Sequence, residues 1–117
     1  MQPTNAPSWW NDTLEIADLT VNVSRLEPAI SGFLVAAAEI HEEMFALPLT
    51  VTSGNDGNHV GNSKHGEWKA ADIRSRDVSE ADANRFAQAL VTLQAIYKVG
   101  IFDERFIGPA HWHVETA

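Results

Sequence analysis

The sequence contains no cysteine in its 117 residues. This excludes disulfide bonds and thiolate ligands, so any bound metal has to be held by His, Asp or Glu side chains. No apolar run approaches the roughly 20 residues that a membrane-spanning helix needs, and we expect no membrane partner. The first residues, "MQPTNAPSWWNDT", lack the basic and apolar regions and the cleavage site of a secretory signal. We therefore expect synthesis in the cytoplasm without a signal peptide.

Positive charge is also scarce. Eight Lys and Arg residues stand against sixteen Asp and Glu residues, which gives a formal net charge of -8 at pH 7. An acidic surface repels the phosphate backbone of nucleic acids and anionic membranes. Nucleic acid is therefore not an expected partner.

The length suits one domain, and a hydrophobic content of 44% is enough for one core. Residues 1–13 are rich in Pro, Asn, Ser and Trp and predict an irregular N-terminal arm. Residues 14–117 then form a single domain, which we expect to be a monomer.

Apolar residues at helical spacing predict a helix from Glu27 to about Met44. Ser79, with Asp82 three residues on, predicts the start of a second helix that ends near Ala95. Strands are expected in "LTVTSG", "AADIR", "IYKVGIF" and "HWHVE", and an irregular loop from Asn55 to Lys69. This order predicts an α+β fold, a small antiparallel sheet with helices packed on one side.

The five histidines are placed unevenly, because four of them fall in the expected loop or in the last strand. Side chains alternate across a strand, so His111, His113 and Glu115 share one face. His41 lies at the margin of the apolar stripe of the first helix, and we interpret it as structural.

Asp72 lies between Ala71 and Ile73 in an otherwise apolar strand, where an unpaired carboxylate would cost several kcal/mol to bury. A divalent metal held by His65, Asp72 and one of the two terminal histidines accounts for this placement. Two imidazoles and one carboxylate with an open fourth position are typical of catalytic zinc, which acidifies a water molecule. In the other interpretation Asp72 caps a turn or pairs with a nearby Arg or Lys, and the terminal histidines form the polar face of an edge strand.

The segment "DGNHVGNSKHGEWKAADIR" resembles the signature of the M15-type peptidases and of the hedgehog signalling domain. Ser63, His65, Asp72 and Ile73 match the spacing of that signature, and "HWHVE" resembles the terminal strand of the family. The resemblance spans roughly residues 27–117. It implies a hedgehog and DD-peptidase fold in which Zn²⁺ is held by His65, Asp72 and His113.

The same resemblance implies roles for residues around the metal. His111 would polarise substrate or steady the attacking water, and His59 would flank the open coordination site. The family usually carries a Glu or Asp general base shortly before the terminal histidines, where this chain has Gly108, Pro109 and Ala110. The candidate catalytic bases are therefore His111, which strand alternation favours, together with His59 and Glu104.

A second departure concerns the substrate. The family usually has an arginine after the "TSG" turn that grips the substrate carboxylate, and this chain has Asn55 and Asp56 there. Ser63 and Arg74 are the predicted substrate-binding residues, with Lys64 and Lys69 as further basic candidates.

The leading hypothesis is a zinc peptidase that cuts bacterial peptidoglycan stem peptides, as a carboxypeptidase or an endopeptidase. It would act at the cell wall after release by another factor, as in phage lysis, or as part of a virion. The alternative is a noncatalytic zinc module of the same fold with a structural or binding role. A third hypothesis is a histidine-rich protein without a metal.

Overall fold

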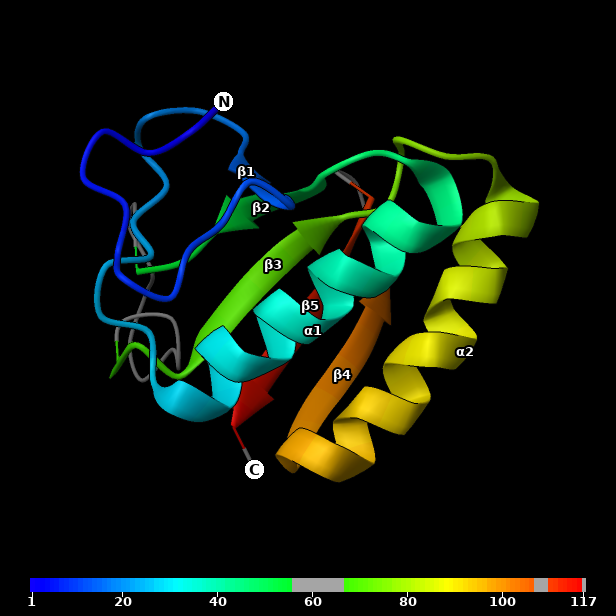
Figure 1. The fold of residues 1–117 in the computed structure, drawn as a ribbon. Coiled ribbons are helices and arrows are strands. Elements are labelled where there is room, and N and C mark those ends of the chain that lie inside the picture. The colour runs from blue at the N-terminus through cyan, green and yellow to red at the C-terminus, as the bar shows by residue number, and fades with distance from the viewer. Residues whose placement is uncertain (56–66, 107–109, 117) are drawn as a thin grey trace.

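In the computed structural model, residues 1–55, 67–106 and 110–116 are described. They form two helices and a five-stranded sheet, and both helices lie on the same side of the sheet (Figure 1). The helices are α1 (Pro28–Phe45) and α2 (Glu80–Tyr97). The strands are β1 (Leu14–Ile16), β2 (Leu49–Ser53), β3 (Ala70–Arg74), β4 (Val99–Glu104) and β5 (His111–Thr116). This confirms an α+β architecture with helices on one side.

The sheet has the strand order β1-β2-β3-β5-β4. Its pairs are antiparallel except for β1 and β2, which run parallel. The sheet is therefore mixed, whereas the sequence predicted an antiparallel one. The difference comes from β1, a three-residue strand that is too short to show an alternating pattern, and that pairs with β2 across the whole of α1.

The two helices begin where the sequence predicts. Pro28 occupies the first turn of α1, and the Ser79 hydroxyl accepts a hydrogen bond from the Asp82 amide at the start of α2, at 3.2 Å. Helix α2 ends later than expected, because Ile96 and Tyr97 belong to the helix and Lys98 terminates it in the left-handed conformation. Tyr97 is retained in the helix because its ring packs edge-on against Phe33 of α1.

The core lies between the helices and the sheet. Phe33 of α1 and Phe86 of α2 are almost completely buried, and Ile73, Trp112 and Val114 meet them from the sheet. In β3 and β5 these sheet residues alternate with polar ones, so the face turned away from the helices carries the polar side chains. Packing thus determines which face is available for chemistry.

His41 is buried and structural, as expected from its place in α1. Its Nδ1 lies 2.8 Å from the Leu47 carbonyl oxygen just beyond the end of that helix. Its ring packs edge-on against Phe45 and Phe86 at about 5 Å between centroids. The side chain therefore ties the end of α1 to α2 and is far from the polar face.

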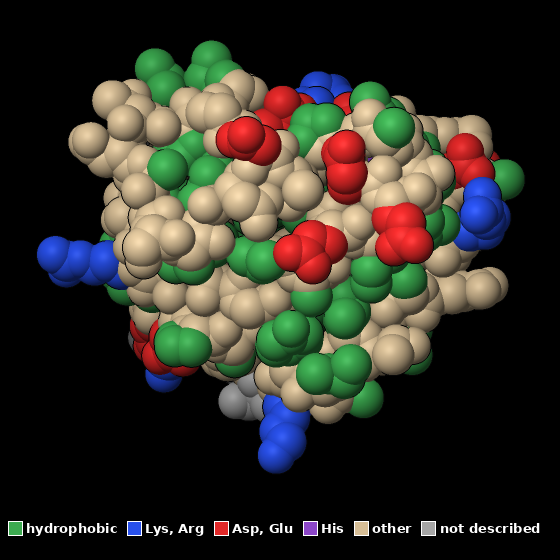
Figure 2. Space-filling model, viewed as in Figure 1, with side chains coloured by type: hydrophobic (Ala, Val, Ile, Leu, Met, Phe, Trp, Pro, Cys, Tyr) green, Lys and Arg blue, Asp and Glu red, His purple; other side chains and the backbone are tan. Residues whose placement is uncertain are grey.

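On the helix-bearing side, acidic side chains lie among hydrophobic ones, and most Lys and Arg side chains lie toward the rim (Figure 2). Glu39, Glu42 and Glu43 are exposed on α1 and contribute to the net negative charge. Neither helix in the described ranges combines the length and the apolar character that a bilayer crossing requires.

The partly buried carboxylate of Glu15, on the edge strand β1, predicts a pH effect on stability. The Glu15 carboxylate accepts a 2.7 Å hydrogen bond from the Thr50 hydroxyl, and this bond lowers the pKa of Glu15. A carboxyl group with a lowered folded-state pKa stabilises the protein above its ordinary pKa. That contribution is lost as the pH falls through the lowered value. We expect the melting temperature of Glu15→Gln to fall less steeply than that of the wild type below about pH 4.5.

Melting curves of both proteins between pH 7 and pH 3 check this expectation. Glu39→Gln, which changes an exposed glutamate on α1, should follow the wild-type profile. Identical pH profiles for Glu15→Gln and the wild type would contradict the role of Glu15.

Candidate metal and catalytic site

The polar face of the sheet brings together a cluster of acidic and histidine side chains. Asp72 on β3 is the register partner of His113 on β5, and Glu104 on β4 is the register partner of His111 on β5. Because β5 lies between β3 and β4, three strands contribute to one patch. We call Asp72, Glu104, His111, His113 and Glu115 the acidic–histidine cluster.

Each ring nitrogen of His113 lies within hydrogen-bond distance of a carboxylate. Its Nδ1 lies 2.8 Å from Asp72 Oδ1, and its Nε2 lies 2.9 Å from Glu115 Oε1. The hydrogen bond with Asp72 raises the pKa of His113 above its ordinary value, against the opposing effect of partial burial. Asp72 and His113 therefore form a close hydrogen-bonded pair.

His111 lies next to this pair. Its Nε2 is 3.6 Å from Glu104 Oε1 and 4.0 Å from Asp72 Oδ1. Both His111 and His113 have side chains about one-sixth exposed, so part of each side chain is accessible to solvent. Glu104, one of the candidate catalytic bases, is brought beside His111 by the antiparallel pairing of β4 with β5.

Only some of the predicted ligands, bases and substrate-binding residues lie in the described part of the chain. Asp72, His111, His113 and Glu104 lie in the cluster, whereas His59, Ser63, Lys64 and His65 lie outside the described residues. Within the described ranges, no group of three or more His, Asp or Glu side chains is arranged to hold a metal ion. The donor types of Asp72 and His113, a carboxylate and an imidazole, are those that zinc binds in catalytic sites. The chemistry of these two donors is therefore compatible with zinc, and His65, the third ligand that the resemblance implies, lies outside the described residues.

Gly54 and Asn55 come shortly before the segment that carries His59, Ser63 and His65. A Cβ atom at Gly54 would lie 2.1 Å from the backbone oxygen of Asn22, so no larger residue fits without a backbone shift. The Asn55 amide donates to the same oxygen at 2.8 Å. The chain therefore leaves β2 along a path that is determined by the loop before α1.

Arg74, the predicted substrate-binding residue, is the register partner of His111. Its guanidinium is held by Asp77, with Nη2 3.0 Å from Oδ1, and approaches the Thr50 hydroxyl at 3.5 Å. A pocket of about 200 Å³ opens beside it. This pocket is lined by Ala17, Asp18, Thr52, Arg74, Arg76, Ala110 and His111.

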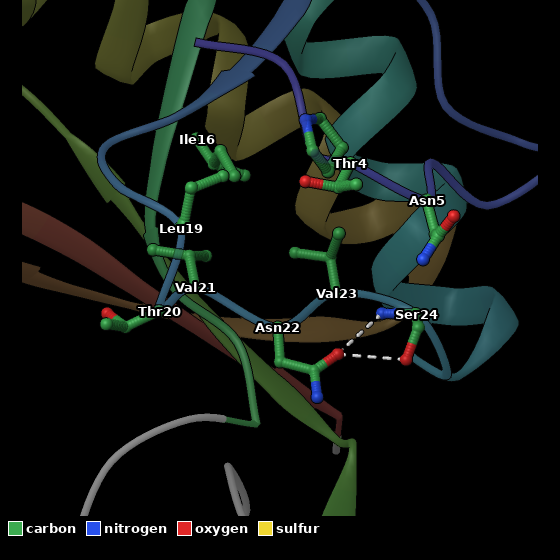
Figure 3. A pocket seen from close by; sticks show the side chains of 10 residues that line it. Thr4, Asn5, Ile16, Leu19, Thr20, Val21, Asn22, Val23 and Ser24 are labelled. Carbon is green, nitrogen blue, oxygen red and sulfur yellow. Dashed lines mark hydrogen bonds between the residues drawn. The ribbon is translucent and has the colours of Figure 1, made fainter.

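A larger cavity of about 360 Å³ lies elsewhere, between the N-terminal arm and residues 16–24 (Figure 3). Its side chains are aliphatic, hydroxyl or amide groups, and the Asn22 amide oxygen accepts hydrogen bonds from the amide and hydroxyl of Ser24. The lining contains no acidic, basic or histidine side chain. This cavity therefore has no acid–base or metal-binding groups, and the acidic–histidine cluster remains the candidate site.

The sequence pointed to Glu115 without assigning it a role. Alternation placed Glu115 on the face of His111 and His113, and the structure adds its 2.9 Å contact with His113. No place at the site was predicted for Phe102. In the structure its ring centroid lies 5.8 Å from that of the His113 ring. Phe102 stands two residues before Glu104 in β4, so strand alternation places both side chains on the same face.

No protein-family model matches the chain, and no curated protein is similar enough to count as a match. The acidic–histidine cluster and the sequence motifs that supply its residues are therefore the features that bear on function.

Proposed function

We propose that this protein is a zinc-dependent peptidase that cleaves the stem peptides of bacterial peptidoglycan, with His65, Asp72 and His113 as the metal ligands. The observation that carries the proposal is the 2.8 Å pairing of Asp72 with His113, beside which His111 and Glu104 lie on the same face. Histidine and carboxylate side chains that lie close together on one partly exposed face are typical of sites for metal-assisted hydrolysis.

When bound, zinc supplies Lewis acidity, which polarises a carbonyl group and lowers the pKa of water. In this proposal His111 accepts at Nε2 a proton from the attacking water, and Glu104, whose Oε1 lies 3.6 Å from that atom, stabilises the resulting imidazolium. The proton then passes to the leaving amine. The two residues thus act as one acid–base unit, in place of the carboxylate that the resemblance led us to expect at Gly108, Pro109 or Ala110.

Arg74 and Arg76 suit the binding of an anionic group of the substrate, because both line the pocket that adjoins His111. Asp77 holds the Arg74 guanidinium in place, so the charge is oriented before the substrate arrives. Ser63 is proposed to contribute a hydroxyl to the same substrate. We also propose that the protein acts at the cell wall, either after release by another factor or as part of a virion.

The direct test is incubation of the purified, zinc-loaded protein with peptidoglycan, followed by mass spectrometry of the released peptides. We expect peptide products that disappear when a chelator is added and return with Zn²⁺. The bond that is cut distinguishes a carboxypeptidase from an endopeptidase. Bound zinc without any product would favour the alternative, a noncatalytic zinc module, and that alternative is supported by Gly108, Pro109 and Ala110 at the usual position of the base.

The proposed acid–base unit predicts how two substitutions combine. His111→Ala is expected to lower kcat about 10² to 10⁴-fold, the range for loss of a general base. Glu104→Gln should lower it less, because Glu104 acts through His111. Since the two groups form one unit, the double variant should be no slower than about the slower single variant.

Steady-state kinetics of the three variants on one peptide substrate test this coupling, with zinc content measured in each. Glu39→Gln serves as a control for loss of a glutamate charge far from the cluster. Wild-type kcat in His111→Ala, or fully additive effects in the double variant, would contradict the assignment.

A further inference from the structure

Both ring nitrogens of His113 face a carboxylate. Asp72 Oδ1 lies 2.8 Å from Nδ1, and Glu115 Oε1 lies 2.9 Å from Nε2. Asp72 is itself a proposed zinc ligand, and Glu115 is not. A neutral imidazole that binds a metal through one nitrogen carries its proton on the other. The side of the ring that faces Glu115 is therefore the side that keeps the proton.

We propose that Glu115 is the positioning residue of the zinc site, which accepts the Nε2 hydrogen of His113 and thereby keeps Nδ1 directed toward Asp72 as the metal-binding atom. This inference rests on the proposed zinc site. Carboxylates that accept a hydrogen bond from a metal-bound histidine select its tautomer and ring orientation and raise its basicity. Glu115 is thus assigned a role that does not require contact with metal or substrate.

The sheet keeps Glu115 in position for this role. Strand β5 is paired on both sides, and the register partners of Glu115 are Ala70 on β3 and Gly100 on β4. Neither residue has side-chain atoms beyond Cβ, and a Cβ atom added at Gly100 would lie 3.9 Å from Glu115 Cγ. The carboxylate therefore has room to turn along the strand toward His113, two residues away.

Glu104 differs from Glu115 in this respect. Its Oε1 lies 3.6 Å from Nε2 of His111, which the proposed function treats as an acid–base group and not as a ligand. Both glutamates lie on the same sheet face and contribute one negative charge each. Glu104 is therefore a matched control, because its loss removes the same charge without touching His113.

Zinc affinity measured by competition with a chromophoric chelator tests the inference. Glu115→Ala is expected to bind Zn²⁺ about 10 to 100-fold more weakly than the wild type, the usual cost of losing such a partner. Glu115→Gln, whose amide oxygen still accepts the Nε2 hydrogen, should remain closer to the wild type than Glu115→Ala. Glu104→Gln should show a smaller loss than Glu115→Ala.

A second measurement separates orientation from charge. Long-range ¹H–¹⁵N spectra of the zinc-loaded wild type are expected to show the His113 proton on Nε2, and Glu115→Gln should keep this pattern. Circular dichroism of the zinc-free proteins shows whether each variant is folded. In a folded Glu115→Ala we expect this proton signal to broaden or move.

These measurements distinguish failure of the proposed function from failure of the proposed role of Glu115. Wild-type protein that binds no Zn²⁺ would overturn the proposed function, and the role of Glu115 with it. Zinc bound equally tightly by the wild type and Glu115→Ala would overturn the role of Glu115 alone. Equal losses in Glu115→Ala, Glu115→Gln and Glu104→Gln would also overturn it, because a general charge effect would then explain the data.

Discussion

Replacement of Asp72 by alanine is expected to abolish zinc binding and peptide hydrolysis while the protein remains folded. Asp72 is one of three proposed ligands, and it lies 2.8 Å from His113, another of them. Its removal should weaken Zn²⁺ binding by more than the roughly 10 to 100-fold that the loss of an outer partner causes. Asp72→Asn keeps the size of the side chain and should lose zinc as well, because a neutral amide oxygen is a poorer zinc ligand than a carboxylate.

Metal analysis after dialysis and the peptidoglycan assay measure this effect. Asp12→Ala, which removes an exposed carboxylate from the N-terminal arm, is the matched control and should retain zinc and activity. The zinc-free Asp72→Ala protein should still unfold cooperatively, at a melting temperature somewhat below that of the zinc-free wild type, because the 2.8 Å hydrogen bond with His113 is lost. Tight zinc binding by a folded Asp72→Ala protein would remove Asp72 from the ligand set.

The second large effect is expected from Phe86→Ala in the core. Phe86 is 1% exposed, and its ring meets those of His41, Phe45 and Trp112. Truncation of a buried phenylalanine typically lowers the free energy of unfolding by about 3–5 kcal/mol. In a domain of this size we expect the melting temperature to fall by more than about 10 °C.

Val91→Ala on the same helix is the control for Phe86→Ala. Val91 is 65% exposed, so its truncation should change the free energy of unfolding by no more than about 0.5 kcal/mol. Urea unfolding and thermal melts of both variants provide the comparison. A loss below about 1 kcal/mol in Phe86→Ala would show that the two helices and the sheet do not share the core described above.

Phe86 also connects the core to the candidate site. Trp112, which contacts Phe86 from the sheet, stands between His111 and His113 in β5. Its side chain points into the core, and the two histidines point to the opposite face because side chains alternate along the strand. Packing of Trp112 therefore holds both histidines in place, and Phe86→Ala should weaken zinc binding as well as stability.

The sequence predicts some of the helices and strands more accurately than others. Helices α1 and α2 were predicted to within a few residues, because their apolar spacing and the Ser79 cap are local signals. The end of α2 was predicted too early, since Ile96 and Tyr97 have side chains that favour strands, and tertiary packing of Tyr97 on Phe33 outweighs that preference. Strand β1 was missed because three residues carry no recognisable period.

Composition and local order in the sequence determined the acidic character, the absence of thiolate ligands, the α+β class and the shared face of His111, His113 and Glu115. The tertiary structure decided which residues of different strands meet. Alternation defines the face of each strand, but register depends on contacts between segments far apart in the chain. Insertion of β5 between β3 and β4 therefore placed Asp72 opposite His113 and Glu104 opposite His111, which neighbouring residues alone do not specify.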